Sequence, residues 1–117
     1  MTDKIIDSIS KSQLVYLEAN YDRDMLFRGT KYPLSLKRRI DGPNGHLSNS
    51  NSAEAIEKLV ASGTRQIVLS HLSKENNTPA LAFNYITQTI ERDGIKEGED
   101  VRIDVATTNI GSFFRVR

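Results

Sequence analysis

Hydrophobic residues along the chain fall into short runs that predict strands. Two of these runs, 14–17 and 67–69, are apolar at every position, which is typical of strands covered on both faces. Residues 101–105 instead alternate apolar and charged side chains, the period of a strand with one solvated face. A last short strand is predicted over 114–116, where Phe114 and Val116 repeat that period.

The segments between these runs contain residues that start and stop helices. Residues 22–27 predict a short helix closed by Gly29, and Pro33 opens a second helix that ends at the turn residues 42–45. A further amphipathic turn is predicted over residues 4–9, before the first strand. The first half of the chain therefore combines one strand with several short helices.

Two longer helices are predicted from capping residues and from helical spacing. Asn51 followed by Glu54 resembles a capping box, and Gly63 lies where a glycine ends a helix. Thr78–Pro79 supplies the N-cap and first residue of the next helix, which Gly94 stops. The apolar positions of the two helices are Ala53, Ile56, Leu59 and Val60, then Phe83, Ile86 and Ile90.

This alternation of strands and helices predicts an α/β fold with a mainly parallel sheet flanked by helices. In parallel sheets, functional residues cluster beyond the carboxyl ends of the strands. Two candidates stand at such ends: Glu18 follows the first strand, and His71 follows the second.

Composition narrows the function classes. The chain has 117 residues, enough for one domain, and a formal net charge of +1. It has no cysteine, which excludes disulfides and thiolate metal sites, and its only histidines are His46 and His71. No apolar run approaches the roughly 18–20 residues of a membrane span. With no signal-peptide pattern at its start either, we expect a cytoplasmic protein without membrane contact.

Three titratable residues are candidates for chemistry. His71, at a strand end with polar neighbours, could bind a metal or move a proton, or it could simply hydrogen-bond the next loop. His46 follows Gly45 in a loop, where it could meet a ligand or be merely solvated. Glu18, directly after an apolar strand, is partly shielded and needs a partner, which could be catalytic or a structural ion pair.

A basic span, Arg23–Arg39, contains six basic residues and one acidic residue. It is interleaved with Phe27 and Tyr32, so a nucleic-acid backbone or another polyanion could dock there. The alternative is a solvated charged face without a partner. The sequence contains no P-loop, dinucleotide-binding fingerprint or nucleophile elbow.

Three segments, 17–22, 35–49 and 69–79, together resemble a known family. Their order and spacing are similar to the C-terminal half of a bacterial metallo-β-lactamase-fold hydrolase, of the small subfamily of DNA exonucleases distantly similar to tRNase Z. The resemblance runs from about residue 4 to residue 117. It implies half of an αββα sandwich, with 1–117 as a single C-terminal half-domain and the N-terminal metal-binding half absent.

The resemblance also implies roles for individual residues. His71 resembles the last metal ligand of the fold, and Glu18 with His46 resembles the pair that donates a proton to the leaving oxygen. The intact protein would hold two zinc or manganese ions, but the family motif His-x-His-x-Asp-His is absent from this chain. The residues expected to contact substrate are Lys37, Arg38, Arg39, Asn49 and Asn76.

We therefore expect part of a metal-dependent hydrolase, a phosphodiesterase or nuclease acting on DNA or RNA, which is inactive as an isolated fragment and holds metal weakly. The alternative is a non-catalytic α/β module that binds nucleic acid or a protein partner through Arg23–Arg39. We further expect the isolated chain to self-associate, because half a fold exposes apolar surface that the other half would cover.

Overall fold

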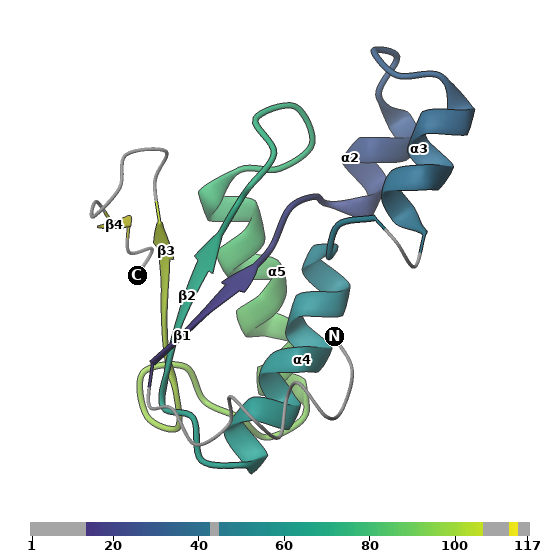
Figure 1. Ribbon diagram of the computed structural model, residues 1–117. Helices are drawn as coiled ribbons and strands as arrows, with labels where there is room; N and C mark the ends of the chain where they lie inside the picture. Colours follow the sequence, from purple (N-terminus) through teal and green to yellow (C-terminus); the bar gives the residue numbers. More distant parts are fainter. Residues whose placement is uncertain (1–13, 43–44, 107–112, 115–117) are drawn as a thin grey trace.

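A four-stranded sheet in the order β1-β2-β3-β4 is the centre of the fold (Figure 1). The computed structural model describes residues 14–42, 45–106 and 113–114. The strands are β1 (Leu14–Glu18), β2 (Gln66–Ser70), β3 (Arg102–Ala106) and β4 (Phe113–Phe114). The first three are parallel and β4 is antiparallel to β3, which confirms a mainly parallel α/β fold. The predicted turn over 4–9 and the position of Val116 lie outside the described residues.

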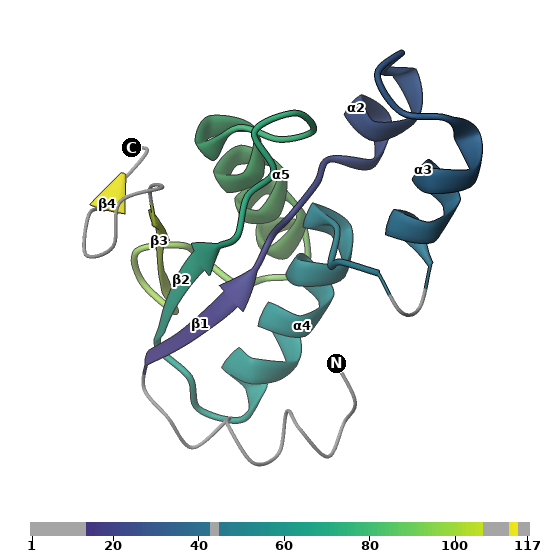
Figure 2. The same cartoon turned by 45° about the horizontal axis from the view of Figure 1, so that its top comes forward.

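The described helices occupy two places. They are α2 (Arg23–Arg28), α3 (Leu34–Asp41), α4 (Asn49–Ala61) and α5 (Pro79–Arg92). Helices α4 and α5 lie side by side along one face of the sheet, while α2 and α3 form a hairpin that stands away from it in both views (Figures 1 and 2). None of the helices in the described part of the chain is long and apolar enough to cross a membrane.

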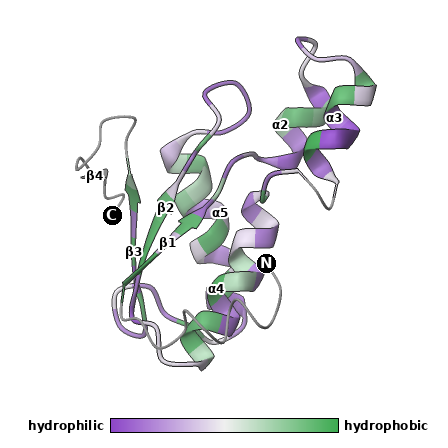
Figure 3. Ribbon diagram, viewed as in Figure 1, coloured by the Kyte–Doolittle hydropathy of each residue, from purple (hydrophilic) through white to green (hydrophobic). Residues whose placement is uncertain are grey.

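The hydrophobic core lies between the sheet and the helices α4 and α5. Alternate residues of each parallel strand point into it, and the inner faces of the two helices complete it. Figure 3 shows the same division as apolar strands facing the apolar sides of these helices. The core residues from the strands are Val15, Leu17, Ile67, Leu69, Ile103 and Val105, and those from the helices include Ile56, Leu59, Phe83, Ile86 and Ile90.

The prediction that both apolar runs are covered on two faces is right for β2 and wrong for β1. In β2, which has a strand on each side, Val68 on the far face is only 3% exposed. In β1, Tyr16 is 60% exposed and Leu14 is 45% exposed. The physical reason is position in the sheet: Val68 is flanked on that face by residues of two neighbouring strands, whereas β1 is an edge strand and has a neighbouring strand on one side only.

Helix α4 begins one turn earlier than the capping pattern predicted. Ser48 is the N-cap, its hydroxyl accepts from the Asn51 N–H at 3.0 Å, and the Asn51 side chain accepts from the Ser48 N–H at 3.2 Å. The capping box is therefore formed by Ser48 and Asn51 rather than by Asn51 and Glu54. The earlier start places Asn49 in the first turn of the helix, where it is buried.

The other helix boundaries agree with the sequence. The Thr78 hydroxyl accepts from the Leu81 N–H at 3.0 Å, with proline at the first helical position of α5. Gly63 and Gly94 follow α4 and α5 with φ values of 114° and 93°, left-handed conformations that glycine adopts without strain.

The exposed outer face of β1 generates a first prediction. We propose that the isolated chain self-associates by covering this face with a second copy, because exposed apolar side chains on an edge strand promote pairing. Tyr16→Ser should shift the chain toward monomer in sedimentation velocity at matched concentration. Tyr85→Ser, which removes an exposed tyrosine from α5, is the control and should leave the distribution unchanged. A wild-type chain that stays monomeric at high concentration would contradict the proposal.

Candidate functional site

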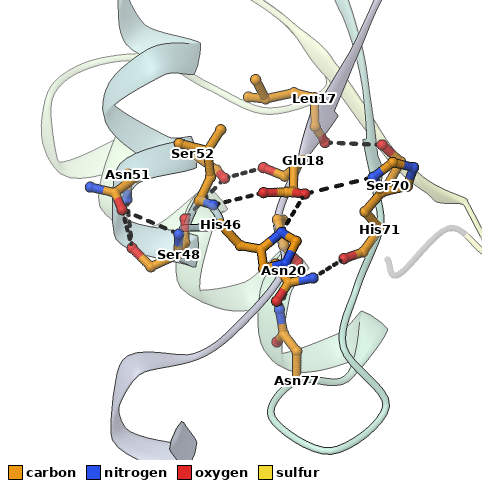
Figure 4. Close-up of polar contacts among 12 residues, drawn as sticks. Leu17, Glu18, Asn20, His46, Ser48, Asn51, Ser52, Ser70, His71 and Asn77 are labelled. Carbon is orange, nitrogen blue, oxygen red and sulfur yellow. Dashed lines mark hydrogen bonds and ion pairs between the residues drawn. The ribbon is translucent and has the colours of Figure 1, made fainter. Parts of the chain in front are cut away.

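The carboxyl ends of β1 and β2 lie next to each other and carry the candidate residues. The parallel register pairs Glu18 with Ser70, so that His71 leaves the sheet directly beside Glu18. His46 reaches the same place from the loop that precedes α4 (Figure 4). The sequence placed Glu18 and His71 at the ends of two strands, and the resemblance paired Glu18 with His46. The structure brings all three side chains together.

Glu18 is the centre of the cluster. Its Oε1 accepts from the Leu47 N–H at 2.7 Å, and its Oε2 lies 3.1 Å from His46 Nδ1 and 3.6 Å from His71 Nδ1. The Glu18 side chain is 22% exposed, whereas the two imidazoles are 55% and 78% exposed. A shielded carboxylate thus holds two accessible imidazoles, an arrangement that can orient ring nitrogens and accept or release a proton at the surface.

The chain directly after β1 fixes the loop that contains His46. We refer to residues 19–22 as the β1 extension. The Asn20 N–H donates to the Leu47 carbonyl at 2.9 Å, and the Asn49 N–H donates to the Tyr21 carbonyl at 2.9 Å. Leu47 is therefore held from both sides, by the main chain of Asn20 and by the Glu18 carboxylate. These contacts bring His46 to Glu18.

The opposite side of the β1 extension fixes the loop that contains His71. The Ser73 N–H donates to the Asn20 carbonyl at 2.7 Å, and the Asp22 N–H donates to the Asn76 carbonyl at 2.7 Å. One four-residue segment thus runs between the two histidine loops and hydrogen-bonds to each of them.

A buried pair of asparagines holds the helices α4 and α5 against this segment. Asn49 Nδ2 donates to Asn77 Oδ1 at 3.1 Å, and Asn77 Nδ2 donates back to Asn49 Oδ1 at 2.9 Å and to the Ala19 carbonyl at 2.9 Å. Asn49 and Asn77 are only 1% and 3% exposed, and Asn76, named from the sequence for substrate contact together with Asn49, is 7% exposed. The structure places Asn49 and Asn76 in the interior, where they join segments of the chain.

The basic span separates into buried and exposed residues. Lys37 is 9% exposed, and its Nζ donates to the carbonyls of Phe27, at 3.1 Å, and Gly29. Its charge therefore stabilises the C-terminal end of α2 rather than facing solvent. Arg38 and Arg39 are exposed on α3, and they remain available to an anionic partner.

The hairpin of α2 and α3 is attached to the β1 extension through Tyr21. The Tyr21 hydroxyl donates to Asp41 Oδ1 at 2.6 Å, and Arg23 pairs with the same carboxylate at 3.1 Å. Burial, reinforced by the hydrogen bond to Asp41, raises the pKa of the Tyr21 hydroxyl above its ordinary value, so that it stays protonated and donates. No sequence pattern predicted this contact, because it joins two residues 20 positions apart.

The described residues do not form a complete metal site. No group of three or more His, Cys, Asp or Glu side chains within them is arranged to hold a metal ion. A two-metal site needs several such ligands, so the residues present do not fit the expected zinc or manganese pair by themselves. Of the candidates, His71 is the residue that the resemblance assigned to a metal.

The fold and the site thus define an α/β unit with a carboxylate and two imidazoles at the edge of a parallel sheet. Over 103 residues, 88% of the chain, it is 35% identical to the exodeoxyribonuclease YycJ of Bacillus anthracis. It is 33% identical over the same length to the exodeoxyribonuclease WalJ of Streptococcus pneumoniae strains D39 and R6. The match spans only 39% and 38% of those proteins. No family model and no solved structure matches the chain.

The contacts of Glu18 generate a second prediction. Glu18→Ala should lower the free energy of unfolding by about 1–3 kcal/mol, because the Leu47 N–H loses its acceptor. Urea denaturation measures the loss, and faster amide exchange at Leu47 locates it. His46→Ala, which truncates a half-exposed ring, should cost no more than about 0.5 kcal/mol. Equal losses for the two variants would contradict the central position of Glu18.

Proposed function

We propose that residues 1–117 form the C-terminal half-domain of a metallo-β-lactamase-fold phosphodiesterase that cleaves DNA. The observation that carries the proposal is the convergence of His46 and His71 on Glu18 at the carboxyl edge of the sheet. The similarity to part of two exodeoxyribonucleases supports hydrolysis of a DNA phosphodiester as the reaction.

In this proposal His46 is the proton donor and Glu18 orients it. Glu18 engages Nδ1 of His46, which leaves Nε2 free to face the substrate. An imidazolium held in this way donates its Nε2 proton to the oxygen that leaves the phosphorus, and the carboxylate balances the positive charge of the ring. Because the ring is half-exposed, a nucleic-acid strand can reach it without a large rearrangement.

In this proposal, most of the metal ligands come from the N-terminal half of the family fold and not from this chain. His71 would contribute one imidazole to a zinc or manganese ion, whose role is to polarise the phosphate and activate water. A single imidazole holds metal weakly, so the isolated chain should be inactive and should bind zinc poorly.

A third prediction tests the proton donor in the natural gene product that contains this chain. His46→Ala should lower kcat for DNA hydrolysis by about 10²–10⁴-fold, as expected for loss of a general acid, with little change in KM. Metal content measured on the same samples should be unchanged, because the proposal gives His46 no ligand role.

The isolated 117-residue chain is the control and should show no hydrolysis. Full activity of His46→Ala would refute the proton-donor role. Two tightly bound zinc ions in the isolated chain would refute the half-domain proposal. DNA binding by the gene product without hydrolysis would favour the non-catalytic module instead.

A fourth prediction concerns the exposed arginines of α3. If Arg38 and Arg39 contact phosphates, the double variant Arg38→Gln/Arg39→Gln should weaken DNA binding and reduce the slope of log K against log salt by up to about two. Fluorescence anisotropy at several salt concentrations measures both quantities. Arg92→Gln/Lys96→Gln removes the same charge from another exposed region and should have a smaller effect. Equal effects of the two double variants would indicate general electrostatic attraction only.

A further inference from the structure

We infer that Asn20 is a positioning residue that holds the His71 backbone in a left-handed conformation and thereby keeps the His71 imidazole against Glu18. The inference rests on the proposed function for its catalytic consequence, but its geometry stands on the contacts of Asn20 itself. No role for this asparagine followed from the sequence beyond its polar character at a strand end.

The first observation is the backbone of His71. Its φ is 55°, and among the described residues it is the one non-glycine residue with a positive φ. A side chain with a Cβ is disfavoured in this region, so neighbouring contacts must hold it there. The Asn20 side chain supplies such a contact, because its Nδ2 donates to the His71 carbonyl at 2.7 Å (Figure 4).

The second observation is that the main chain of Asn20 is itself fixed on both sides. Its N–H donates to the Leu47 carbonyl at 2.9 Å, and its carbonyl accepts from the Ser73 N–H at 2.7 Å. The side-chain amide therefore extends from a fixed point, between the loop of His46 and the loop of His71. A contact from such a point can determine the conformation of the residue that it reaches.

The consequence concerns the distance between His71 and Glu18. His71 Nδ1 lies 3.6 Å from Glu18 Oε2, and the ring is 78% exposed, so little packing restrains it. If His71 returned to an ordinary backbone conformation, its Cα–Cβ bond would point in a new direction and carry the ring away from the carboxylate. Asn20 prevents this change through its hydrogen bond to the His71 carbonyl.

The test compares isosteric and donor-retaining variants of Asn20. Asn20→Asp keeps the shape but replaces the N–H donor with an oxygen that repels the His71 carbonyl. Nuclear magnetic resonance on this chain should then show a changed HN–Hα coupling at His71, which reports its backbone φ, and a His71 ring that no longer keeps one orientation. The midpoint of thermal unfolding should be nearly unchanged. Asn20→Gln, which keeps an amide donor, should preserve more of the wild-type coupling. Asn84→Asp, an exposed asparagine of α5, is the charge-matched control and should change neither.

In the natural gene product, Asn20→Asp should lower kcat by about 10–100-fold through misplacement of the ring, with KM nearly unchanged. An unchanged His71 coupling in Asn20→Asp would overturn the inference. A changed coupling with full kcat would confirm that Asn20 positions His71 and overturn the catalytic consequence. If the wild-type gene product hydrolyses no DNA, the proposed function fails. The resonance comparison in this chain still decides whether Asn20 positions His71.

Discussion

The structure depends on how the chain continues after β1. Residues 19–22 leave the sheet, yet their backbone groups still need partners, because unpaired peptide groups at a partly buried site are costly. The partners on one side are Leu47, in the loop after α3, and Asn49, the first residue of α4, and those on the other side are Ser73 and Asn76, in the loop after β2. The hydrogen bonds that pair the backbone groups of residues 19–22 therefore also fix the loops that contain His46 and His71.

The buried pair of Asn49 and Asn77 has the same effect on the helices. The two side-chain amides donate hydrogen bonds to each other, and Asn77 also donates to the Ala19 carbonyl. These bonds join α4, the N-terminal side of α5 and the β1 extension at one point. Hydrogen bonds in such a low-dielectric position are strong when complete and costly when one partner is lost. This explains why two asparagines can occupy positions that are almost inaccessible to solvent.

The hairpin of α2 and α3 is stabilised differently from the sheet layer. It stands outside the main core. The hydrogen bond from the Tyr21 hydroxyl to Asp41 attaches it to the β1 extension, and the ion pair of Arg23 with the same carboxylate joins α2 to α3 within the hairpin. The His46 N–H also donates to the Ile40 carbonyl at 3.2 Å, so the end of α3 contacts the loop of the candidate proton donor. Anion binding at Arg38 and Arg39 would consequently take place on an element connected directly to the site.

The sequence alone determined the order of elements, the parallel sheet and the candidate residues Glu18, His46 and His71, because hydrophobic period, capping residues and glycine stops are local properties. It did not determine that β1 is exposed at the edge, that Lys37 turns inward, or that Ser48 rather than Asn51 caps α4. The exposure of β1 and the burial of Lys37 depend on contacts between segments that a local pattern does not contain. The cap of α4 is itself local, but the Asn49 N–H at the start of this helix also donates to the distant Tyr21 carbonyl. An apolar run has the same sequence pattern in a central strand and in an edge strand. A lysine likewise carries the same charge whether water or two carbonyl groups surround it. Only the tertiary structure decided which neighbours each residue meets.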